Sequence, residues 1–261
     1  MQNSLFFAEP AAFRRYIFPM DPIPANRSLA YLLGRRSAPL FLKANWIFKA
    51  LAGSEKEKIS AEFQMGLLLA QAYEEKVPTF GSNRLDEIAA QLTARLRNKN
   101  RQHRFRLDQS GELNACAIPG GFIYVSEKLF DLCGEDTDAI AFVLAHEMAH
   151  GIHGDANERY LTKTVISGLL RLKTRGLSPG TQQLLARLIQ QGYSREQEFR
   201  ADRFAVALTR AAGFDPEGGC RLFSNLRKTS NDPNPFGAYL SSHPPMDERI
   251  KRIEKRIKER A

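Results

Sequence analysis

An apolar run that begins at Ala139 ends in the sequence His146-Glu147-Met148-Ala149-His150. A run of this length and composition is typical of a buried helix, and helix positions four residues apart share a face. His146 and His150 can therefore hold one metal ion between their imidazoles. Glu147 points about a quarter-turn away, from where it can reach a water molecule on that metal. The pattern predicts one half of a metal site.

The third metal ligand is not found directly after this motif. A catalytic zinc ion usually has three protein ligands and an open position for water. In one extended form of the motif, a glycine and a histidine would follow at positions 153 and 156, which hold His153 and Ala156. The remaining ligand must therefore lie elsewhere in the chain.

An acidic pair further along the chain is the best candidate for that ligand. Glu198 and Asp202 are four residues apart in a predicted helix, 195–212, and so lie on one helix face. A carboxylate there can bind the metal, and a second one a turn later can accept an imidazole N–H. The alternative is a pair of solvated charges balanced by neighbouring arginines. The presence of the histidine motif favours the metal site.

The periodicity of the rest of the chain predicts an α+β fold that is mostly α. We expect helices at 55–75, 84–97, 127–133, 157–173, 181–191 and 195–212, with Asn83 as the N-cap of the second. Strands are expected near 103–107, 113–118 and 122–125, forming a small antiparallel sheet beside the helix that carries His146. Residues 1–53, rich in aromatic, basic and proline residues, are expected to form an N-terminal extension, and residues 54–261 one domain.

The composition is that of an ordinary globular protein, with 43% hydrophobic and 26% charged residues among 261. The chain has no apolar run long enough to span a bilayer, and charged residues interrupt the N-terminus too early for a secretory signal. We therefore expect a cytoplasmic protein, in contact with a membrane at most peripherally. Three cysteines without metal-like spacing argue against a disulfide framework.

The net charge of +9 is concentrated in part near the C-terminus. The segment 249–260 carries seven basic residues, with isoleucines at helical spacing. We interpret it as a terminal helix docked by its isoleucines, with its charges in water. The alternative is peripheral membrane contact through this helix or through residues 1–50. Nucleic acid is not expected as a partner.

Four separated motifs together resemble the gluzincin metalloendopeptidases. They are His146-Glu147-x-x-His150, Glu198-x-x-x-Asp202, the segment 114–125, and Ser242-His243-Pro244-Pro245. The resemblance is to the branch that contains the CAAX prenyl endopeptidases, the heat-shock protease HtpX and the BepA-type periplasmic proteases. It covers roughly residues 60–261 and implies a zincin-like catalytic domain over residues 54–261.

The resemblance also implies roles for individual residues. One Zn²⁺ per chain would be bound by His146, His150 and Glu198, with Asp202 behind a histidine. The segment beginning with Asn114 and Ala115 would bind substrate along the cleft, which His243 would also line. The branch's membrane helices and tetratricopeptide repeats are missing from this sequence, so its substrates cannot be carried over.

The expected chemistry is hydrolysis of a polypeptide by metal-activated water with Glu147 as general base. His243 is the first choice as oxyanion donor, and Tyr193 or Tyr239 the second. Alternatively, His243 covers the metal and keeps the enzyme latent.

The sequence thus predicts a zinc metalloendopeptidase for protein quality control or processing. Two alternatives remain: a DNA-associated zinc protease that acts on nucleic-acid-bound proteins, and a latent or inactive zinc-fold chaperone or membrane-surface binding module. Salt-dependent DNA binding would distinguish the first of these, and the effect of Glu147→Gln on cleavage the second.

Overall fold

The computed structural model describes residues 52–163, 192–228, 243 and 246–259. Its elements are α3 (Glu55–Glu74), β1 (Thr79–Phe80), α4 (Asn83–Ala94), β2 (Arg104–Asp108), β3 (Ala115–Ile118), β4 (Phe122–Ser126), α5 (Glu127–Cys133), α6 (Thr137–Ile152), α9 (Arg195–Ala212), α10 (Gly218–Lys228) and α12 (Met246–Lys258). Residues 155–163 are also helical. The predicted α+β, mostly α class is confirmed. The expectations for residues 1–51, helix 181–191 and Tyr239 fall outside the described residues.

The four strands form one sheet in the order β1-β2-β4-β3. β4 pairs antiparallel with β3 but parallel with β2, so the sheet is mixed, and the predicted antiparallel sheet is wrong in this respect. The reason is that β3 and β4 form a hairpin whose second strand returns between β2 and β3. Successive strands along the chain still alternate in direction. Because β4 lies between β2 and β3, however, one of its neighbours is parallel to it and the other is antiparallel. β3 is left at the end of the sheet.

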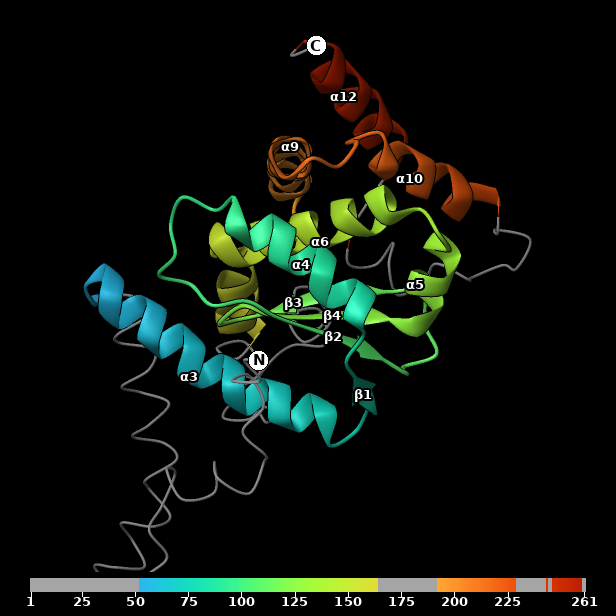
Figure 1. Cartoon of the computed structure of the whole chain (residues 1–261). Helices are drawn as coiled ribbons and strands as arrows, with labels where there is room; N and C mark the ends of the chain where they lie inside the picture. The colour runs from blue at the N-terminus through green and yellow to red at the C-terminus, as the bar shows by residue number, and fades with distance from the viewer. Residues whose placement is uncertain (1–51, 164–191, 229–242, 244–245, 260–261) are drawn as a thin grey trace, which may run out of the picture. The chain divides into compact units, whose positions relative to one another are not determined.

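Helices cover both faces of this sheet (Figure 1). α3 lies along one face, while α6 lies on the other with α4 beside it. α9 and α10 pack on α6, and α12 packs on α9 and α10. Thirteen consecutive residues of α6, from Ala139 to Gly151, are buried. The helix that carries the histidine motif is therefore the centre of the core.

Capping side chains define where the main helices begin. Ser54 and Ser194 each form a capping box, with Glu57 and with Gln197 respectively. Asp136 accepts a hydrogen bond from the backbone N of Ala139 at the start of α6. The cap of α4 is Ser82 rather than the predicted Asn83, because Ser82 has extended backbone angles and its hydroxyl faces the first turn.

One glycine sets the distance between α3 and the sheet. A Cβ atom at Gly66 would lie 1.7 Å from the carbonyl oxygen of Pro119, in the β3–β4 turn. The next residue of this turn, Gly120, has φ +83° and would place a Cβ 2.8 Å from the Cα of Phe63. The backbones of helix and turn are thus in direct contact, which only residues without a side chain permit.

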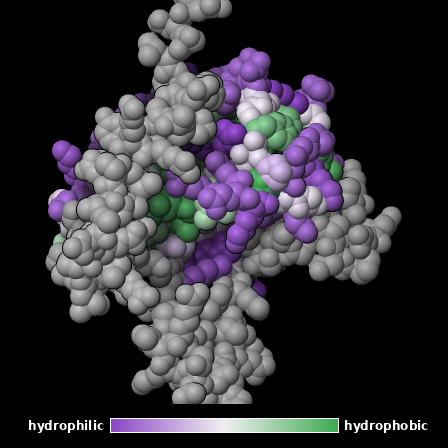
Figure 2. Space-filling model, turned by 90° about the horizontal axis from the view of Figure 1, so that it is seen from below, coloured by the Kyte–Doolittle hydropathy of each residue, from purple (hydrophilic) through white to green (hydrophobic). Residues whose placement is uncertain are grey.

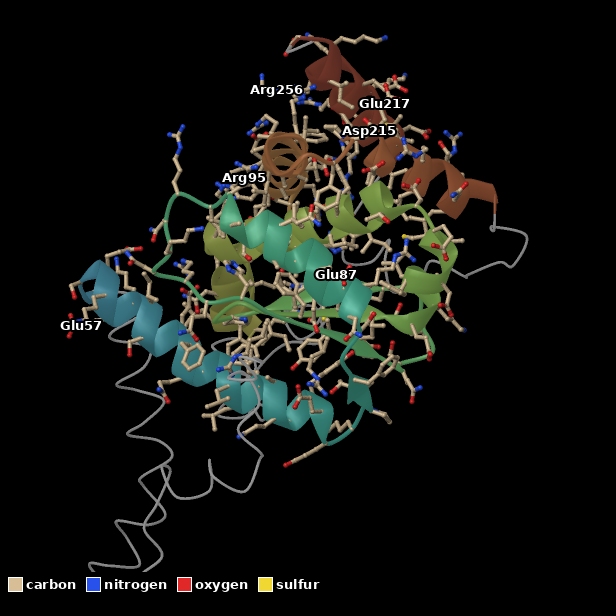
Figure 3. The ribbon with its side chains drawn as sticks, in the orientation of Figure 1. Glu57, Glu87, Arg95, Asp215, Glu217 and Arg256 are labelled. Atoms are coloured by element: carbon tan, nitrogen blue, oxygen red, sulfur yellow. The ribbon has the colours of Figure 1, made fainter. Side chains whose placement is uncertain are left out.

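The described surface is mostly hydrophilic. Seen from below, apolar side chains gather only in small patches (Figure 2), and Leu68 of α3 is the one exposed large hydrophobic side chain in the ranges given above. Charged side chains that line the outside come from α3, α4, the α9–α10 connection and α12 (Figure 3). No helix within the described ranges is long and apolar enough to cross a membrane.

Candidate metal centre

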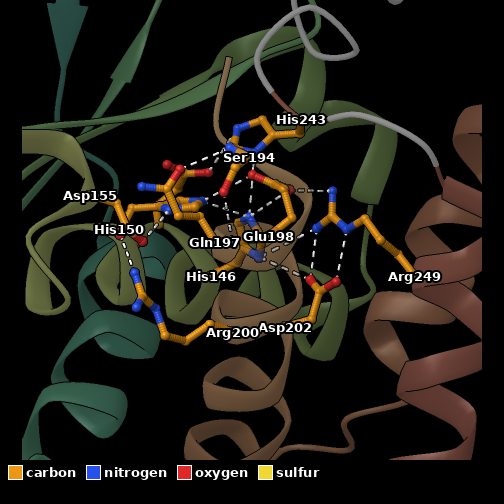
Figure 4. Close-up of polar contacts among 11 residues, drawn as sticks. His146, His150, Asp155, Ser194, Gln197, Glu198, Arg200, Asp202, His243 and Arg249 are labelled. Carbon is orange, nitrogen blue, oxygen red and sulfur yellow. Dashed lines mark hydrogen bonds and ion pairs between the residues drawn. The ribbon is translucent and has the colours of Figure 1, made fainter. Parts of the chain in front are cut away.

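Four side chains converge where α6, α9 and the segment before α12 meet. They are His146, His150, Glu198 and His243, whose candidate ligand atoms all lie within 4.8 Å of one another (Figure 4). All four are buried. The two α6 histidines approach through their Nε2 atoms, 3.1 Å apart. The sequence had placed these residues in three segments, and the structure brings them together.

Glu198 turns one carboxylate oxygen toward the centre of this cluster. Its Oε1 lies 3.3 Å from Nε2 of His150 and 2.9 Å from Nδ1 of His243. The side chain is held there because α9 begins at a capping box one turn earlier, which fixes the helix start beside α6.

Each α6 histidine is held from behind by a carboxylate. Nδ1 of His146 lies 3.0 Å from Oδ1 of Asp202, and Nδ1 of His150 lies 3.2 Å from Oδ2 of Asp155. A hydrogen bond at Nδ1 leaves the Nε2 lone pair free to face the cluster, and it fixes the ring orientation. The two imidazoles therefore present Nε2 to the cluster, the orientation that metal-binding imidazoles need.

Glu147 lies beside the cluster without belonging to it. Its Oε1 is 3.5 Å from Nε2 of His243, and its Oε2 is buried with no hydrogen-bond partner among the described residues. Burial raises the pKa of the Glu147 carboxyl, an effect that the neighbouring histidines partly offset. A carboxyl of this kind suits proton transfer to and from a reacting group.

Residues 81–257 match the sequence profile of Peptidase family M48. The chain belongs to this family. The match covers every residue of the cluster and both carboxylates behind the histidines, and it confirms the resemblance to gluzincin metallopeptidases.

Several proteins of known name are similar to this M48 chain. The mitochondrial metalloendopeptidase OMA1 of Schizosaccharomyces pombe is 30% identical over 150 residues, which is 56% of this chain and 44% of OMA1. A putative beta-barrel assembly-enhancing protease of Vibrio cholerae is 26% identical over 182 residues, 64% of this chain and 37% of that protein. The metalloprotease YcaL of Escherichia coli is 27% identical over 167 residues, 59% of this chain and 61% of YcaL. The chain thus spans less than half the length of the first two.

Two arginines of the M48 site, Arg249 and Arg200, were not predicted as site residues. Arg249 of α12 is fully buried and donates to Asp202 through Nε at 2.8 Å and Nη2 at 2.7 Å. Arg200 of α9 pairs with Asp155. The prediction that the charges of the last helix lie in water is therefore wrong for Arg249. That residue lies one helical turn before Ile253 and so shares the face that docks.

Asp155 and Tyr193 complete the surroundings of His150. Asp155 follows Gly154, whose φ of +79° ends α6 and redirects the chain so that the carboxylate reaches His150. The ring of Tyr193 stacks on the imidazole, with centroids 3.7 Å apart and planes 7° from parallel. The guanidinium of Arg159 lies 4.9 Å from the centroid of the same tyrosine ring. No local sequence pattern distinguishes Asp155 from a loop aspartate.

The charges of the site fit a divalent cation. Four carboxylates are at most 2% exposed, those of Glu147, Asp155, Glu198 and Asp202. Arg249 and Arg200 pair with three of them, so when the imidazoles are neutral, as metal binding requires, four ionised carboxylates would face two guanidinium charges. A divalent metal ion would balance the difference, since buried charge is tolerated only when compensated.

The same charges set the pKa values of two ligand candidates. Burial lowers the pKa of His150, but hydrogen bonds to Asp155 and Glu198 outweigh this effect and raise it to about 9. Burial raises the pKa of Glu198, but His243, His150 and His146 outweigh it and hold this pKa well below the usual range. Glu198 is therefore ionised, as a metal ligand must be.

Asn114 and Ala115 lie at the start of the edge strand β3. The backbone N of Asn114 donates to Oγ of Ser126 at 3.0 Å, and Ala115 is buried opposite Val125. The side-chain Oδ1 of Asn114 is buried without a hydrogen-bond partner in the described part of the chain. The structure places the two residues beside β4 and not within the four-residue cluster.

Proposed function

We propose that this chain is a zinc-dependent endopeptidase. The observation that carries the proposal is the buried cluster of three imidazoles and one carboxylate, with ligand atoms within 4.8 Å of one another. Imidazole nitrogen and carboxylate oxygen form the usual ligand set of catalytic zinc. Membership of a peptidase family supports the reaction, and four buried carboxylates beside two arginines support a divalent ion.

His146, His150 and Glu198 would hold the zinc, with Asp202 orienting the first histidine. When bound, zinc lowers the pKa of a bound water to about 7 and polarises a peptide carbonyl. The protein's own part is to supply three ligands in a fixed orientation inside a buried site. Because Asp202 and Asp155 hold Nδ1 of each ring, little reorganisation is needed when the metal binds.

Glu147 would move the protons of the reaction. It accepts a proton from the attacking water while the water oxygen bonds to the peptide carbonyl carbon. It then donates that proton to the amine nitrogen as the C–N bond breaks. The raised pKa of this carboxyl makes it a stronger base toward the water proton that it takes up and returns.

The substrate would be an extended polypeptide alongside β3. In the order β1-β2-β4-β3, one edge of β3 pairs with no strand of the described sheet. An extended peptide can add to such an edge through backbone hydrogen bonds. Ala115 is the first residue of this strand and Asn114 directly precedes it, and the two are the proposed substrate-binding residues.

His243 could either cover the metal site or donate a hydrogen bond to the oxyanion, and the geometry favours the first role. Its Nδ1 belongs to the same cluster of candidate ligand atoms as His146, His150 and Glu198, so the cluster offers a metal four protein ligands. A catalytic zinc site keeps one position open. We infer that His243 covers the site in this arrangement and must move away from Glu198 before a substrate enters.

A role in protein processing or quality control is the biological context that the relatives suggest. One of them is named a mitochondrial metalloendopeptidase and another a putative assembly-enhancing protease. Neither the DNA-associated alternative nor the non-enzymatic one is favoured by any feature of the described residues.

Metal analysis of the purified full chain tests the proposed site. We expect one zinc per chain in the wild type and in Glu196→Gln, a control on the same helix whose side chain is 77% exposed. Glu198→Gln should lose most of its zinc on dialysis, because the amide supplies no charge. A wild-type chain without zinc, or Glu198→Gln with full zinc content, would contradict the proposal.

A further inference from the structure

Arg249 contacts both carboxylates that α9 directs toward the metal site. Nε and Nη2 form a two-pronged interaction with Asp202, at 2.8 Å and 2.7 Å. The third nitrogen, Nη1, lies 2.8 Å from Oε2 of Glu198. One guanidinium from α12 therefore bridges two acidic residues one helical turn apart on α9 (Figure 4).

This arrangement divides the two oxygens of Glu198. Oε2 lies 2.8 Å from Nη1 of the guanidinium and 3.6 Å from Nε2 of His146, whereas Oε1 is turned toward His150 and His243. A carboxylate held at one oxygen presents the other in a defined direction, as metal ligands in general require. Without the guanidinium, the carboxylate could rotate or bind with both oxygens.

The interaction with Asp202 acts on His146 in the same way. Asp202 accepts from Nδ1 of His146 through Oδ1, the same oxygen that lies 2.7 Å from Nη2 of Arg249. The chain of contacts runs from the guanidinium through the carboxylate to the ring. Fixing Asp202 therefore fixes the ring that presents Nε2 to the metal.

α12 holds this arginine rigidly. Ile253, one turn further along α12, is 1% exposed within the core, and the guanidinium carbon lies 4.6 Å from the ring centroid of Phe223 of α10. A fully buried guanidinium is costly unless its charge is compensated, and here two carboxylates compensate it. Packing and charge both favour a single orientation.

We propose that Arg249 is a positioning residue for the metal site, so that docking of α12 and formation of a strong metal site are one event. This inference rests on the proposed zinc site. It assigns to the C-terminal helix, which contains none of the predicted metal ligands, control over how tightly the metal is held.

Three variants of the full chain test this inference through zinc affinity, measured by competition with a chromophoric chelator at fixed pH. Arg249→Gln removes the positive charge and the bidentate contact with Asp202. We expect this variant to bind zinc about 10- to 100-fold more weakly, which is the usual cost of losing a residue that orients a metal ligand. Arg249→Lys keeps the charge but cannot form the bidentate contact, and it should lose zinc affinity to an intermediate degree. Arg252→Gln is the matched control on the same helix, since Arg252 pairs with Glu248 and is half exposed.

A second readout separates positioning from mere support of the fold. The thermal midpoint of each variant is measured by circular dichroism without and with zinc. If Arg249 positions the ligands, the increase in midpoint on adding zinc is smaller in Arg249→Gln than in Arg252→Gln. A purely structural role would lower both midpoints of Arg249→Gln and leave the increase unchanged, which would overturn the inference.

The remaining outcomes are also decisive. Folded Arg249→Gln that binds zinc within about twofold of the wild type would overturn the inference while leaving the proposed zinc site intact. If that variant does not fold, wild-type affinity in Arg249→Lys would overturn it, because lysine cannot form the two-pronged contact. A wild type that binds no zinc would overturn the proposed function and this inference together.

Discussion

Each α6 histidine of the candidate metal centre is backed by a carboxylate, and each of these carboxylates pairs with an arginine. His146, Asp202 and Arg249 form one such chain, while His150 leads through Asp155 to Arg200. Buried polar groups that are fully paired favour one arrangement over others, because any alternative leaves a charge unpaired. The site is therefore preorganised by contacts behind its ligands.

Removal of His243 should raise the activity if this residue covers the site. If the covered arrangement of the wild type is favoured by about 1.4 kcal/mol, only about one wild-type chain in ten is open to substrate. His243→Ala would then increase the rate of peptide cleavage about tenfold, because it opens the remaining chains. The rate is measured at saturating zinc with a denatured protein substrate. A decrease of about 100-fold would instead identify His243 as an oxyanion donor.

His103 gives a residue-scale prediction about pH. Burial, with a smaller contribution from Arg101, lowers the pKa of this histidine to about 4. The folded chain therefore keeps His103 neutral, while the unfolded chain takes up a proton below about pH 6.5. Stability is lost as the pH falls from about 6.5 toward 4, because only the unfolded state gains the proton.

The matching measurement compares urea unfolding of the wild type and His103→Gln at pH 7 and pH 5, at equal metal content. The free energy of unfolding should fall more in the wild type, by at most about 2 kcal/mol, since the variant has no imidazole to protonate. Equal losses in the two proteins would show that His103 is not held neutral.

At the scale of helices and strands, local patterns predicted most elements but missed α10 and β1, and they did not predict the strand pairing. The helix 195–212 was predicted from the sequence, and the structure has the same bounds for α9. β2, β3 and β4 were placed to within a few residues, but β1 was not predicted and β2 pairs parallel with β4. The order of strands depends on contacts distant in sequence, and alternation within each strand carries no information about its neighbours.

Gly66 tests the close approach of α3 to the sheet. Alanine is the better helix former, yet its Cβ would collide with the backbone of Pro119. Gly66→Ala should therefore lower the free energy of unfolding by about 1–3 kcal/mol.

Gly81→Ala is the matched control, because a Cβ there would have no atom within 4 Å. It should change stability by no more than about 0.5 kcal/mol in chemical denaturation. If Gly66→Ala were as stable as this control, α3 could not be in backbone contact with the β3–β4 turn.

For the whole molecule, the sequence predicted the residues with a fixed spacing and missed those brought together only by folding. His146, His150, Glu198 and Asp202 could be found because four-residue spacing places each pair on one helix face. Asp155, Arg200 and Arg249 could not be assigned, since an isolated aspartate or arginine is far more often a surface charge. Of these three residues, only Arg249 could have been recognised from the sequence, because it lies on the same face of α12 as the isoleucines.

The exposed charges of α12 bear on the partners of the whole chain. Besides Arg249, the helix carries five basic and three acidic residues. Arg252 pairs with Glu248, and Lys255 pairs with Glu259, which directly follows the helix. Peripheral membrane contact through this helix stays a prediction, on a surface of mixed charge.

The most direct test of the central claim is cleavage of a denatured protein by zinc-loaded wild type and Glu147→Gln. Glutamine has nearly the same shape but cannot accept the proton of the attacking water. We predict that Glu147→Gln retains its zinc and loses at least about 100-fold in cleavage rate. Undiminished cleavage by a zinc-loaded Glu147→Gln chain would contradict the proposed mechanism.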